Sequence, residues 1–454
     1  MSDTKIDPTA RLAEFAATLT IDDISSDARD FTKTLFLDAL ACALAGHQGE
    51  ETGQMDAMIS ALAASDETSV IGGGKRSMAG ATILNGYLIT AVTMCDVHRG
   101  LLTHITPEVV PPALAIAERD HDSGRDLLAA LAAGFEVTAR VGLGLDYPVF
   151  RGKGWHGPGV IGPFGSAAAV GRLRGFDAET MARAYGLAGA QSAGTFAAWG
   201  TPTVKWHQCR AALSGLMAAL LAEQDFVATK EFLTAPDGGL YNTYAEGGRI
   251  DLAIGDIGAR WEIEQIALRL WPSATALQDV LTALFDLKQK NDIAFSDIAS
   301  VRVSVCETAH RMHGGFSTYG AKFEALLSAH YVAAVYLRDG VVTLDQFEPA
   351  CYDAPELRAF AAEKVEIVAD TSLKGGEASA EIVTTGGQTL SGKCDYPLGA
   401  PENPLSPDQI RDKFRTYAAK LLTPERTEEV IDAIDGLEDL PDAAVLLEML
   451  RPAG

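Results

Sequence analysis

The chain has 454 residues, of which 47% are hydrophobic, and its 37 basic and 61 acidic side chains give a formal net charge of −24. This length exceeds what one hydrophobic core usually serves, and the apolar content excludes a disordered chain, so two folded domains are expected. The acidic balance argues against nucleic-acid binding and against docking on anionic membranes. An anionic substrate would therefore require a local cluster of positive charge.

The sequence does not indicate export or membrane insertion. The stretch MSDTKIDPTARLAEF has no apolar core of the kind that signal peptides carry. The most apolar helical run, 211–222, is too short to span a bilayer. The 6 cysteines are scattered without a CxxC pair, which is typical of reduced core residues and not of a disulfide framework or an iron–sulfur cluster. A cytoplasmic protein is therefore expected.

Helical patterns dominate the chain up to residue 268. Apolar residues recur at helical spacing in 29–46, where Gly46 is a suitable C-cap. Further helices are expected over 80–94, 123–142 and 177–193, where Ala and Gly would let neighbouring helices approach closely. The tail turns helical again, and we expect it to return to the first domain.

Between these helical parts the pattern alternates as it does in β-strands. Segments 300–307, 365–369 and 378–383 are predicted strands, 384–388 is a predicted hairpin turn, and 321–340 is a predicted helix. The predicted fold is therefore mainly α. It has a large all-helical domain, formed by 1–268 together with 398–454, and a smaller α+β domain at 269–397.

Two glycine-rich stretches do not fit nucleotide-binding motifs. In GGGKRS (72–77) the lysine is followed by Arg76 instead of Ser or Thr, so a polar turn is expected. GLGLDY (142–147) lacks the third glycine of a dinucleotide fingerprint. There is no HExxH motif, and the spacing of His98 and His104 does not place both on one helical face. The sequence therefore predicts no organic cofactor and no metal.

Polar residues interrupt apolar helices in the stretch 95–112, CDVHRGLLTHITPEVVPP. Asp96, His98 and His104 lie in a loop that joins two buried helices, so these side chains must be satisfied or functional. The alternative to a functional role is helix capping together with a pair between Asp96 and either His98 or Arg99.

His156 is the polar side chain of the Gly/Pro-rich turn 154–165, which precedes a helix. Two interpretations remain open. His156 is a neutral histidine that caps the helix, or it is a general acid or base near a helix N-terminus, whose field favours an anionic substrate. Tyr147 and Arg151, just upstream, would assist the second role.

Three potential cations stand close together in TPTVKWHQCR (201–210), namely Lys205, His207 and Arg210. Their apolar neighbours imply burial, and a buried cation needs a negative partner. That partner is a carboxylate of the protein or a carboxylate of the substrate. Arg269 lies at the predicted domain junction, where sites often form. Lys322 opens a helix of the second domain and is a binding residue, a cap or a solvated charge.

Several segments occur together in one known family. They are LFLDALACALAG (35–46), SVIGGGKRS (69–77), LNGYLITAVTMCDVHRGLLTHITPEVVPPALA (84–115), RGKGWHGPGVIGPFGSAAAVGRLRGF (151–176), GTPTVKWHQCRAALSG (200–215), RLWPS (269–273) and AKFEALLSAHYVAA (321–334). The chain resembles the MmgE/PrpD family, which includes 2-methylcitrate dehydratases, cis-aconitate decarboxylases and iminodisuccinate epimerases. The resemblance implies a helical domain with a smaller α+β lid, usually in a homodimer. It also implies that small polycarboxylates bind between the domains without a metal or organic cofactor.

The resemblance also implies site residues. Asp96, His104, His156 and Lys205 match positions where the family keeps active-site residues, and Arg269 stands where decarboxylase-like members carry Lys. The predicted catalytic residues are His104, His156, Lys205, Asp96 and Tyr147. The predicted substrate-binding residues are His98, His207, Arg210, Arg269 and Lys322.

Two departures from the family pattern bear on the reaction. His98 stands where the family's DDT-type loop has Thr, and Gln278 stands near the position of a His in lyase-like members. The shared step is proton transfer at a carbon next to a carboxylate. Because Gln278 replaces that His, we predict an epimerase that acts on an iminodisuccinate-like substrate. The alternatives are a hydro-lyase of the 2-methylcitrate dehydratase type, a decarboxylase of a tricarboxylate, and a polycarboxylate-binding protein without turnover.

Overall fold

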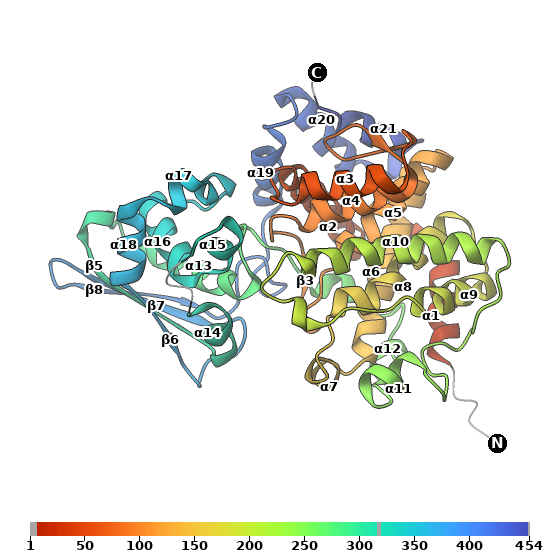
Figure 1. Ribbon diagram of the computed structural model, residues 1–454, viewed down its shortest axis with the longest axis horizontal. Helices are drawn as coiled ribbons and strands as arrows, with labels where there is room; N and C mark the ends of the chain where they lie inside the picture. The colour runs from red at the N-terminus through yellow and green to blue at the C-terminus, as the bar shows by residue number, and fades with distance from the viewer. Residues whose placement is uncertain (1–6, 316–318, 453–454) are drawn as a thin grey trace. The chain divides into compact units, whose positions relative to one another are not determined.

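The computed structural model describes residues 7–315 and 319–452. The chain divides into two compact units (Figure 1). The large unit comprises 1–91, 95–266 and 406–454, and the small unit comprises 92–94 and 267–405. The prediction of a mainly α fold with a smaller α+β part is confirmed. The sequence-based division changes domain at 268/269 and 397/398, whereas the compact units change at 266/267 and 405/406.

The large unit consists mostly of helices, with a few two-residue strands that the all-helical prediction did not include. The helices are α1 (Pro8–Thr18), α2 (Ser26–Gly46), α3 (Thr52–Leu62), α4 (Met78–Thr90), α5 (Thr106–Asp120), α6 (Gly124–Gly144), α7 (Tyr147–Gly152), α8 (Gly157–Leu173), α9 (Ala178–Gly189), α10 (Thr203–Glu223), α11 (Leu240–Ala245), α12 (Ile250–Ile254), α19 (Pro407–Ala418), α20 (Pro424–Asp435) and α21 (Ala444–Met449). The strands are β1 (Thr68–Ser69), β2 (Lys75–Arg76), β3 (Val97–His98) and, at the end of the segment, β4 (Ile266–Ala267). β1 and β2 pair antiparallel, so the glycines of GGGKRS lie in the turn as predicted, whereas its Lys75 and Arg76 form β2.

Helix α8 packs between α6 and α10 in the centre of the large unit. The contacts are close because small residues meet there. A Cβ added to Gly165 of α8 would lie 1.7 Å from Oγ1 of Thr138 on α6, and one added to Gly215 of α10 would lie 2.4 Å from the carbonyl oxygen of Pro163 on α8. Any larger side chain at these glycines would push the helices apart.

Helix α6 is long and apolar enough to cross a membrane by length and composition alone, a feature that was not predicted from the sequence. However, 94% of its apolar 18-residue window is buried inside the protein. Its apolar residues therefore serve the core of the large unit, and their composition is that of a buried helix.

Gly46 ends helix α2, but not in the role that the sequence suggested. It does not adopt a left-handed backbone conformation. A Cβ on Gly46 would lie 2.1 Å from the carbonyl oxygen of Leu88 on α4. Gly46 is therefore required for the close approach of α2 and α4, and not as a left-handed C-cap.

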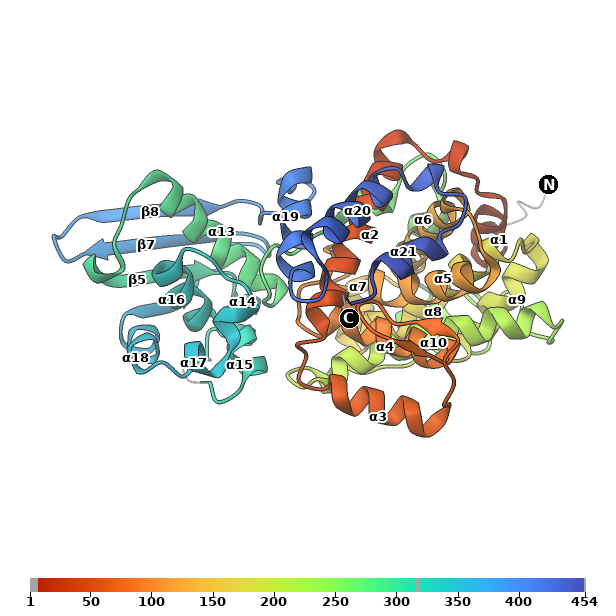
Figure 2. The same ribbon diagram turned by 90° about the horizontal axis from the view of Figure 1, so that it is seen from above.

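The C-terminal helices belong to the large unit, and α19 lies beside α2 (Figures 1 and 2). Nζ of Lys413 on α19 donates to Oδ1 of Asp38 on α2 at 2.6 Å, and both side chains are 1% exposed. Phe414 and Tyr417 of α19 are buried as well. The tail is thus held by hydrophobic packing and by one buried ion pair.

The small unit is built on a four-stranded sheet with the order β6-β5-β7-β8. Its strands are β5 (Ile298–Val305), β6 (Val365–Ala369), β7 (Ala378–Thr384) and β8 (Thr389–Cys394), and its helices are α13 (Thr275–Lys290), α14 (Glu307–His313), α15 (Lys322–Leu327), α16 (Ala329–Asp339), α17 (Pro349–Tyr352) and α18 (Pro355–Glu363). β5 is parallel to β6 and antiparallel to β7, and β7 and β8 form the predicted hairpin. α16, α17 and α18 lie on the same side of this sheet (Figure 1).

One predicted helix of the small unit is two helices. The sequence pattern predicts a single helix over 321–340, but α15 ends at Leu327 and α16 begins at Ala329. Ser328 separates them in an extended conformation, and its Oγ accepts a hydrogen bond from the amide of Tyr331 at 3.0 Å. An N-cap serine starts a new helix here, and the apolar periodicity did not reveal this interruption.

Candidate functional site

Two histidines from different helices meet at the centre of the candidate site in the large unit. His156 directly precedes α8, and His207 lies in the first turns of α10. Their Nδ1 atoms are 2.9 Å apart and their ring centroids 5.1 Å apart. Two ring nitrogens at this distance share one proton, so one imidazole donates and the other accepts. Both residues were predicted site residues, but their pairing was not predicted from the sequence.

Burial lowers the pKa of both histidines, which favours the neutral form of the pair. Burial lowers the pKa of His156 to about 3, assisted by the positive charges that His207, His104 and Arg151 can carry. Burial and the Arg210 guanidinium also lower the pKa of His207. A neutral imidazole pair of this kind can donate a proton from one ring and accept a proton on the other.

The loop 191–194, which we call the strap, fixes the two rings. The amide of His156 donates to the carbonyl of Gly194 at 3.0 Å, and the amide of Ala193 donates to the carbonyl of Gly159 at 3.1 Å. Gly194 has φ +148°, and a Cβ there would lie 3.1 Å from Nδ1 of His207. Glycine at 194 therefore lets the backbone lie against the His207 ring.

Arg210 binds the strap and not a carboxylate. Its guanidinium donates to the carbonyl oxygens of Gln191 at 3.0 Å, Ala193 at 2.6 Å and Gly159 at 3.3 Å. Its pKa is lowered, chiefly by burial. These contacts let Arg210 position the histidine pair, and its predicted contact with substrate stays a prediction.

The loop after α4 carries Asp96 and His104. Asp96 is fully buried, and its carboxylate accepts from the amides of Ile105 at 2.9 Å and Thr106 at 3.1 Å and from Oγ1 of Thr106 at 2.5 Å. Burial raises the pKa of Asp96 to about 6, although the hydrogen bonds from Thr106 and Ile105 lower it. Asp96 thus caps the start of α5, which is the structural alternative that the sequence left open.

His104 is half-buried, and its Nδ1 lies 2.6 Å from the backbone oxygen of Asp96. Because a carbonyl only accepts, Nδ1 of His104 is protonated and Nε2 carries the lone pair in the neutral ring. A positive charge on His104 also lowers the pKa of His156, although less than burial and His207 do. His104 is therefore oriented as a base or hydrogen-bond acceptor beside the histidine pair.

His98 is tied to a buried ion network behind this loop. Its Nε2 lies 3.2 Å from Oε2 of Glu262, and its side chain is 4% exposed. Nδ1 of His98 has no hydrogen-bond partner in the described part of the chain, so the suggested pair between Asp96 and His98 is not formed. The distant Glu262 could not be identified from the local sequence.

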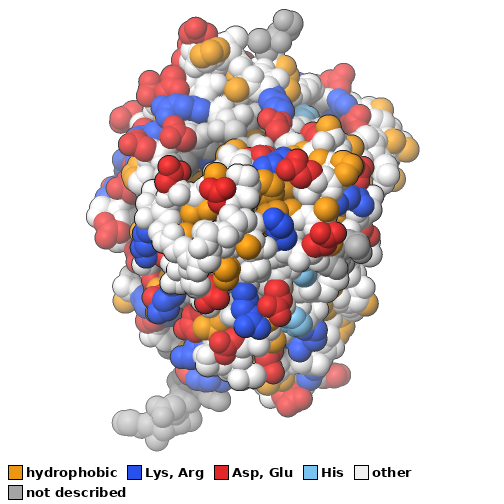
Figure 3. Space-filling view, turned by 90° about the vertical axis from the view of Figure 1, so that its left-hand side faces the viewer, with side chains coloured by type: hydrophobic (Ala, Val, Ile, Leu, Met, Phe, Trp, Pro, Cys, Tyr) orange, Lys and Arg blue, Asp and Glu red, His pale blue; other side chains and the backbone are white. Residues whose placement is uncertain are grey.

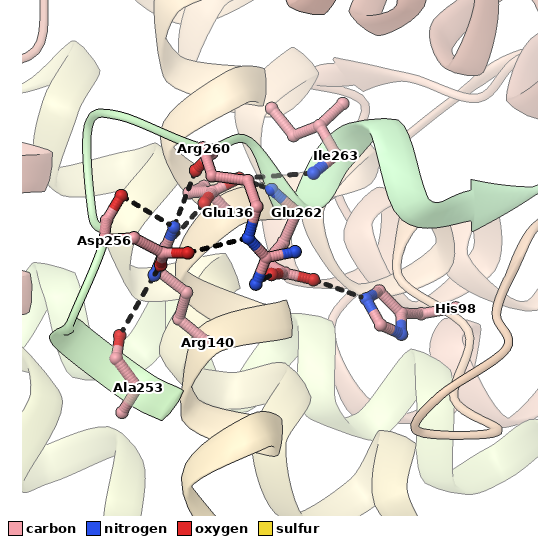
Figure 4. Close-up of polar contacts among 8 residues, drawn as sticks. All are labelled: His98, Glu136, Arg140, Ala253, Asp256, Arg260, Glu262 and Ile263. Atoms are coloured by element: carbon pink, nitrogen blue, oxygen red, sulfur yellow. Dashed lines mark hydrogen bonds and ion pairs between the residues drawn. The ribbon is translucent and has the colours of Figure 1, made fainter. Parts of the chain in front are cut away.

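The network is centred on Arg140 of α6, which has no exposed surface (Figure 4). Its guanidinium donates to Glu136 at 2.5 Å and to Asp256 at 2.9 Å. The amides of Glu262 and Ile263 donate to the other oxygen of Glu136 at 2.8 and 3.2 Å. Through Glu262, the network connects α6 to His98, which explains the burial of His98 without a substrate.

Lys205 is paired with a carboxylate of the protein itself. Its Nζ donates to Oε2 of Glu51 at 3.0 Å, and Lys205 is 4% exposed. The hydroxyl of Tyr87 donates to the same oxygen at 2.7 Å. Although burial raises it, the pKa of Glu51 is lowered overall because Lys205 and Tyr87 stabilise the carboxylate. Sequence reasoning missed Glu51 because no local pattern distinguishes it from other surface acids.

Tyr147 and Arg151 lie on the short helix α7 near His156. The Tyr147 ring packs 6.4 Å from Phe150, and burial raises its pKa. The Arg151 guanidinium lies 3.5 Å from the centroid of the Phe196 ring, and the ring centroids of Phe196 and His156 are 5.8 Å apart in an edge-to-face arrangement. In the described part of the chain, Arg151 has no carboxylate partner, so it is a cation that is available to an anionic ligand.

The remaining predicted residues, Arg269 and Lys322, belong to the small unit. Arg269 is 2% exposed and donates to the carbonyl oxygen of Ser273 at 3.2 Å. Lys322, at the start of α15, pairs with Glu348 at 2.8 Å. Gln278 is buried and holds the turn before α13, since its amide nitrogen donates to the Trp271 carbonyl at 3.0 Å. Gln278 therefore has a structural role here.

Within 7–315 and 319–452, no group of three or more His, Cys, Asp and Glu side chains is arranged to hold a metal ion. One acid that the sequence analysis did not select is Glu108. It is fully buried, and neither carboxylate oxygen has a hydrogen-bond partner. The signal was present in the sequence, because Glu108 is a single charge within an apolar run.

Known proteins resemble the chain over nearly its whole length. The family models described as MmgE/PrpD N-terminal domain and MmgE/PrpD C-terminal domain match residues 10–253 and 271–439. The cis-aconitate decarboxylase-like protein oryM of Aspergillus oryzae is 29% identical to this chain, in an alignment that covers 97% of both proteins. The cis-aconitate decarboxylase of Aspergillus terreus is 26% identical over 99% of this chain and 97% of the relative. The cis-aconitate decarboxylase of Homo sapiens is 27% identical over 82% of this chain and 79% of the relative. These names favour the lyase alternative and lend no support to the epimerase.

Proposed function

Because the chain belongs to the MmgE/PrpD family, we propose that it is a lyase that removes a carboxyl group from a small tricarboxylate of the cis-aconitate type. The observation that carries the proposal is the neutral pair His156–His207 beside His104. It occurs in a chain that aligns over 97% of its length with a decarboxylase-like relative. The proposal replaces the epimerase as our leading hypothesis.

Decarboxylation needs a proton donor more than it needs a strong base. When the C–C bond breaks, CO₂ leaves and the bonding electron pair stays on the carbon skeleton, delocalised over a neighbouring unsaturated carboxylate. That carbon must then take up a proton. A neutral imidazole with a protonated Nε2 can supply it, and His156 is placed for this role next to Phe196 and Arg151.

Arg151 is our candidate for holding a substrate carboxylate. The two cations that the sequence favoured, Lys205 and Arg210, are engaged by Glu51 and by backbone carbonyls. Arg151 instead lies over an aromatic ring, and its charge acts on His156. A guanidinium can bind a carboxylate with two parallel hydrogen bonds and stabilise the charge that develops on it.

The test is CO₂ release by the purified protein from cis-aconitate and related tricarboxylates, with the products followed by NMR. We expect CO₂ release from the wild type and a loss of about 10²–10⁴-fold in kcat for His156→Gln. Arg151→Met should mainly raise KM. His121→Gln, which changes an exposed histidine of the same unit, is the matched control. Deuterium exchange at a dicarboxylate α-carbon without CO₂ release would overturn the decarboxylase and restore the epimerase.

We further propose that the protein is a homodimer that works without a metal or an organic cofactor. Support comes from the family resemblance. Light scattering of the purified protein would test the dimer by its mass. Activity after dialysis against a chelator would test the second statement, because a metal-dependent enzyme would lose turnover.

A further inference from the structure

The contact between His156 and His207 constrains where protons can reside. The two Nδ1 atoms are 2.9 Å apart. If Nδ1 of His207 carries the shared proton, the neutral His156 must carry its own proton on Nε2. If His156 carries the shared proton, the assignment is reversed. In either state of the neutral pair, one Nε2 is a donor and the other is an acceptor.

The backbone holds this geometry, so the rings do not depend on flexible side chains for their contact. A Cβ at Gly159 would lie 2.2 Å from the carbonyl oxygen of Ala193 and 3.3 Å from Cβ of His207. The strap 191–194 is bound by Arg210 at two of its carbonyl oxygens. Both rings are enclosed, since His156 is 8% and His207 is 9% exposed. Such preorganisation is what a proton-transfer path requires.

We propose that His207 relays a proton to His156 during turnover, an inference that rests on the proposed decarboxylation. The C–C bond breaks, CO₂ leaves, and Nε2–H of His156 gives its proton to the carbon that retains the electron pair. Nδ1–H of His207 passes to Nδ1 of His156, and Nε2 of His207 takes a proton from water. One solvent proton is consumed per CO₂. The reverse transfer through water then returns the histidine pair to its first tautomeric state. This return step consumes no further proton.

His207 is thus a positioning residue that acts through His156, and His156 is the residue that meets the substrate. The groups around the pair agree with this order. Phe196, Arg151 and His104 act on His156, whereas Arg210 and the strap are next to His207. The relay keeps His156 neutral after it has donated its proton, which avoids a buried imidazolate.

A proton inventory tests the relay directly. In mixtures of H₂O and D₂O, kcat of the wild type should depend on the D₂O fraction along a curve, because two protons move in one step. His207→Gln should give a straight line, with kcat lowered about 10²-fold and KM within roughly threefold of the wild type. His47→Gln, a half-buried histidine that bonds the backbone oxygen of Ile71, is the matched control and should keep the curvature. A straight line for the wild type, or a His207→Gln variant with unchanged kcat, would overturn the relay.

A second measurement does not depend on the variant's folding or on the substrate. In ¹⁵N NMR of the resting protein with labelled histidine, the relay requires His156 and His207 to be neutral with protons on opposite nitrogens. Two identical tautomers, or an imidazolium at pH 7, would contradict it. If the wild type releases no CO₂ from any tricarboxylate, the proposed function fails, while this spectrum still decides whether the shared proton exists.

Discussion

Buried acids of the large unit differ in how their charge is compensated. Asp96 accepts hydrogen bonds from the start of α5, whereas Glu108, in the first turn of that helix, has no hydrogen-bond partner among the described residues. Burial, together with the nearby Asp96 charge, raises the pKa of Glu108 well above its usual value. Folding therefore favours the protonated form of Glu108.

Replacing this acid should change how stability depends on pH. The pKa of Glu108 is higher in the folded than in the unfolded protein. The contribution of Glu108 to the free energy of unfolding is therefore fully present below pH 4.5 and is lost as the pH rises through the folded pKa. Glu108→Gln should match the wild type at pH 4.5 and become relatively more stable above it, by about 1.4 kcal/mol per pH unit in that window. Urea unfolding at several pH values measures this difference.

The control is Glu67→Gln, at an exposed position, which should show no such divergence. A difference between Glu108→Gln and the wild type that stayed constant with pH would show that Glu108 is not protonated by folding.

The pair of Lys205 with Glu51 permits a test of the predicted grip on substrate. Lys205→Met leaves Glu51 without this cation, so the free energy of unfolding should fall by roughly 3 kcal/mol. The double variant Lys205→Met with Glu51→Leu should recover most of it, because both charges are then removed. Thermal unfolding and CO₂ release would be measured on both. Loss of turnover in a fully stable double variant would assign Lys205 to catalysis after all.

At the scale of secondary-structure elements, the tail is attached through one buried ion pair. Asp38 of α2 and Lys413 of α19 are 375 residues apart in the sequence. Both are almost completely buried. The pair makes the return of the tail specific, because an unpaired charge in this place would be costly.

Lys413→Met should therefore destabilise the large unit by about 3–5 kcal/mol, since Asp38 would stay buried without this cation. Addition of Asp38→Leu should restore much of the loss. Limited proteolysis between the small unit and α19, combined with thermal unfolding, would detect the release of the tail. A single variant that unfolds like the wild type would contradict the structural importance of the pair.

At the scale of the whole molecule, the net charge of −24 opposes an anionic substrate. On the face drawn in Figure 3, acidic and basic side chains are interspersed, and neither sign covers the face. The attraction for a tricarboxylate must therefore come from groups close to the site, while the distant charges repel it.

Salt should consequently speed up substrate capture. Raising the ionic strength from about 0.02 M to about 0.2 M shortens the range of the repulsion, so kcat/KM for a tricarboxylate should increase by a factor of roughly two to ten. Sucrose at equal osmolarity is the control, because it does not screen charge. A decrease of kcat/KM with salt would mean that local cations steer the substrate more strongly than the net charge repels it.

The sequence predicted the fold well where a pattern is local. The helices of the large unit and the hairpin β7–β8 follow from periodicity and turn residues, and the break at Ser328 was missed because a cap looks like any other serine. In the candidate site, the sequence selected His156 and His207. Their pairing and the role of Gly194 could not be predicted, because they depend on segments that meet only in the folded chain.

By itself, the sequence determined the family, the helical and α+β composition of the two units, and the acidic character of the chain. Tertiary structure alone decided which charge has which partner. Lys205 pairs with Glu51, 154 residues away in the sequence, and His98 pairs with Glu262, 164 residues away. Local patterns report that a side chain will be buried, but the partner that compensates a buried charge is set by long-range packing.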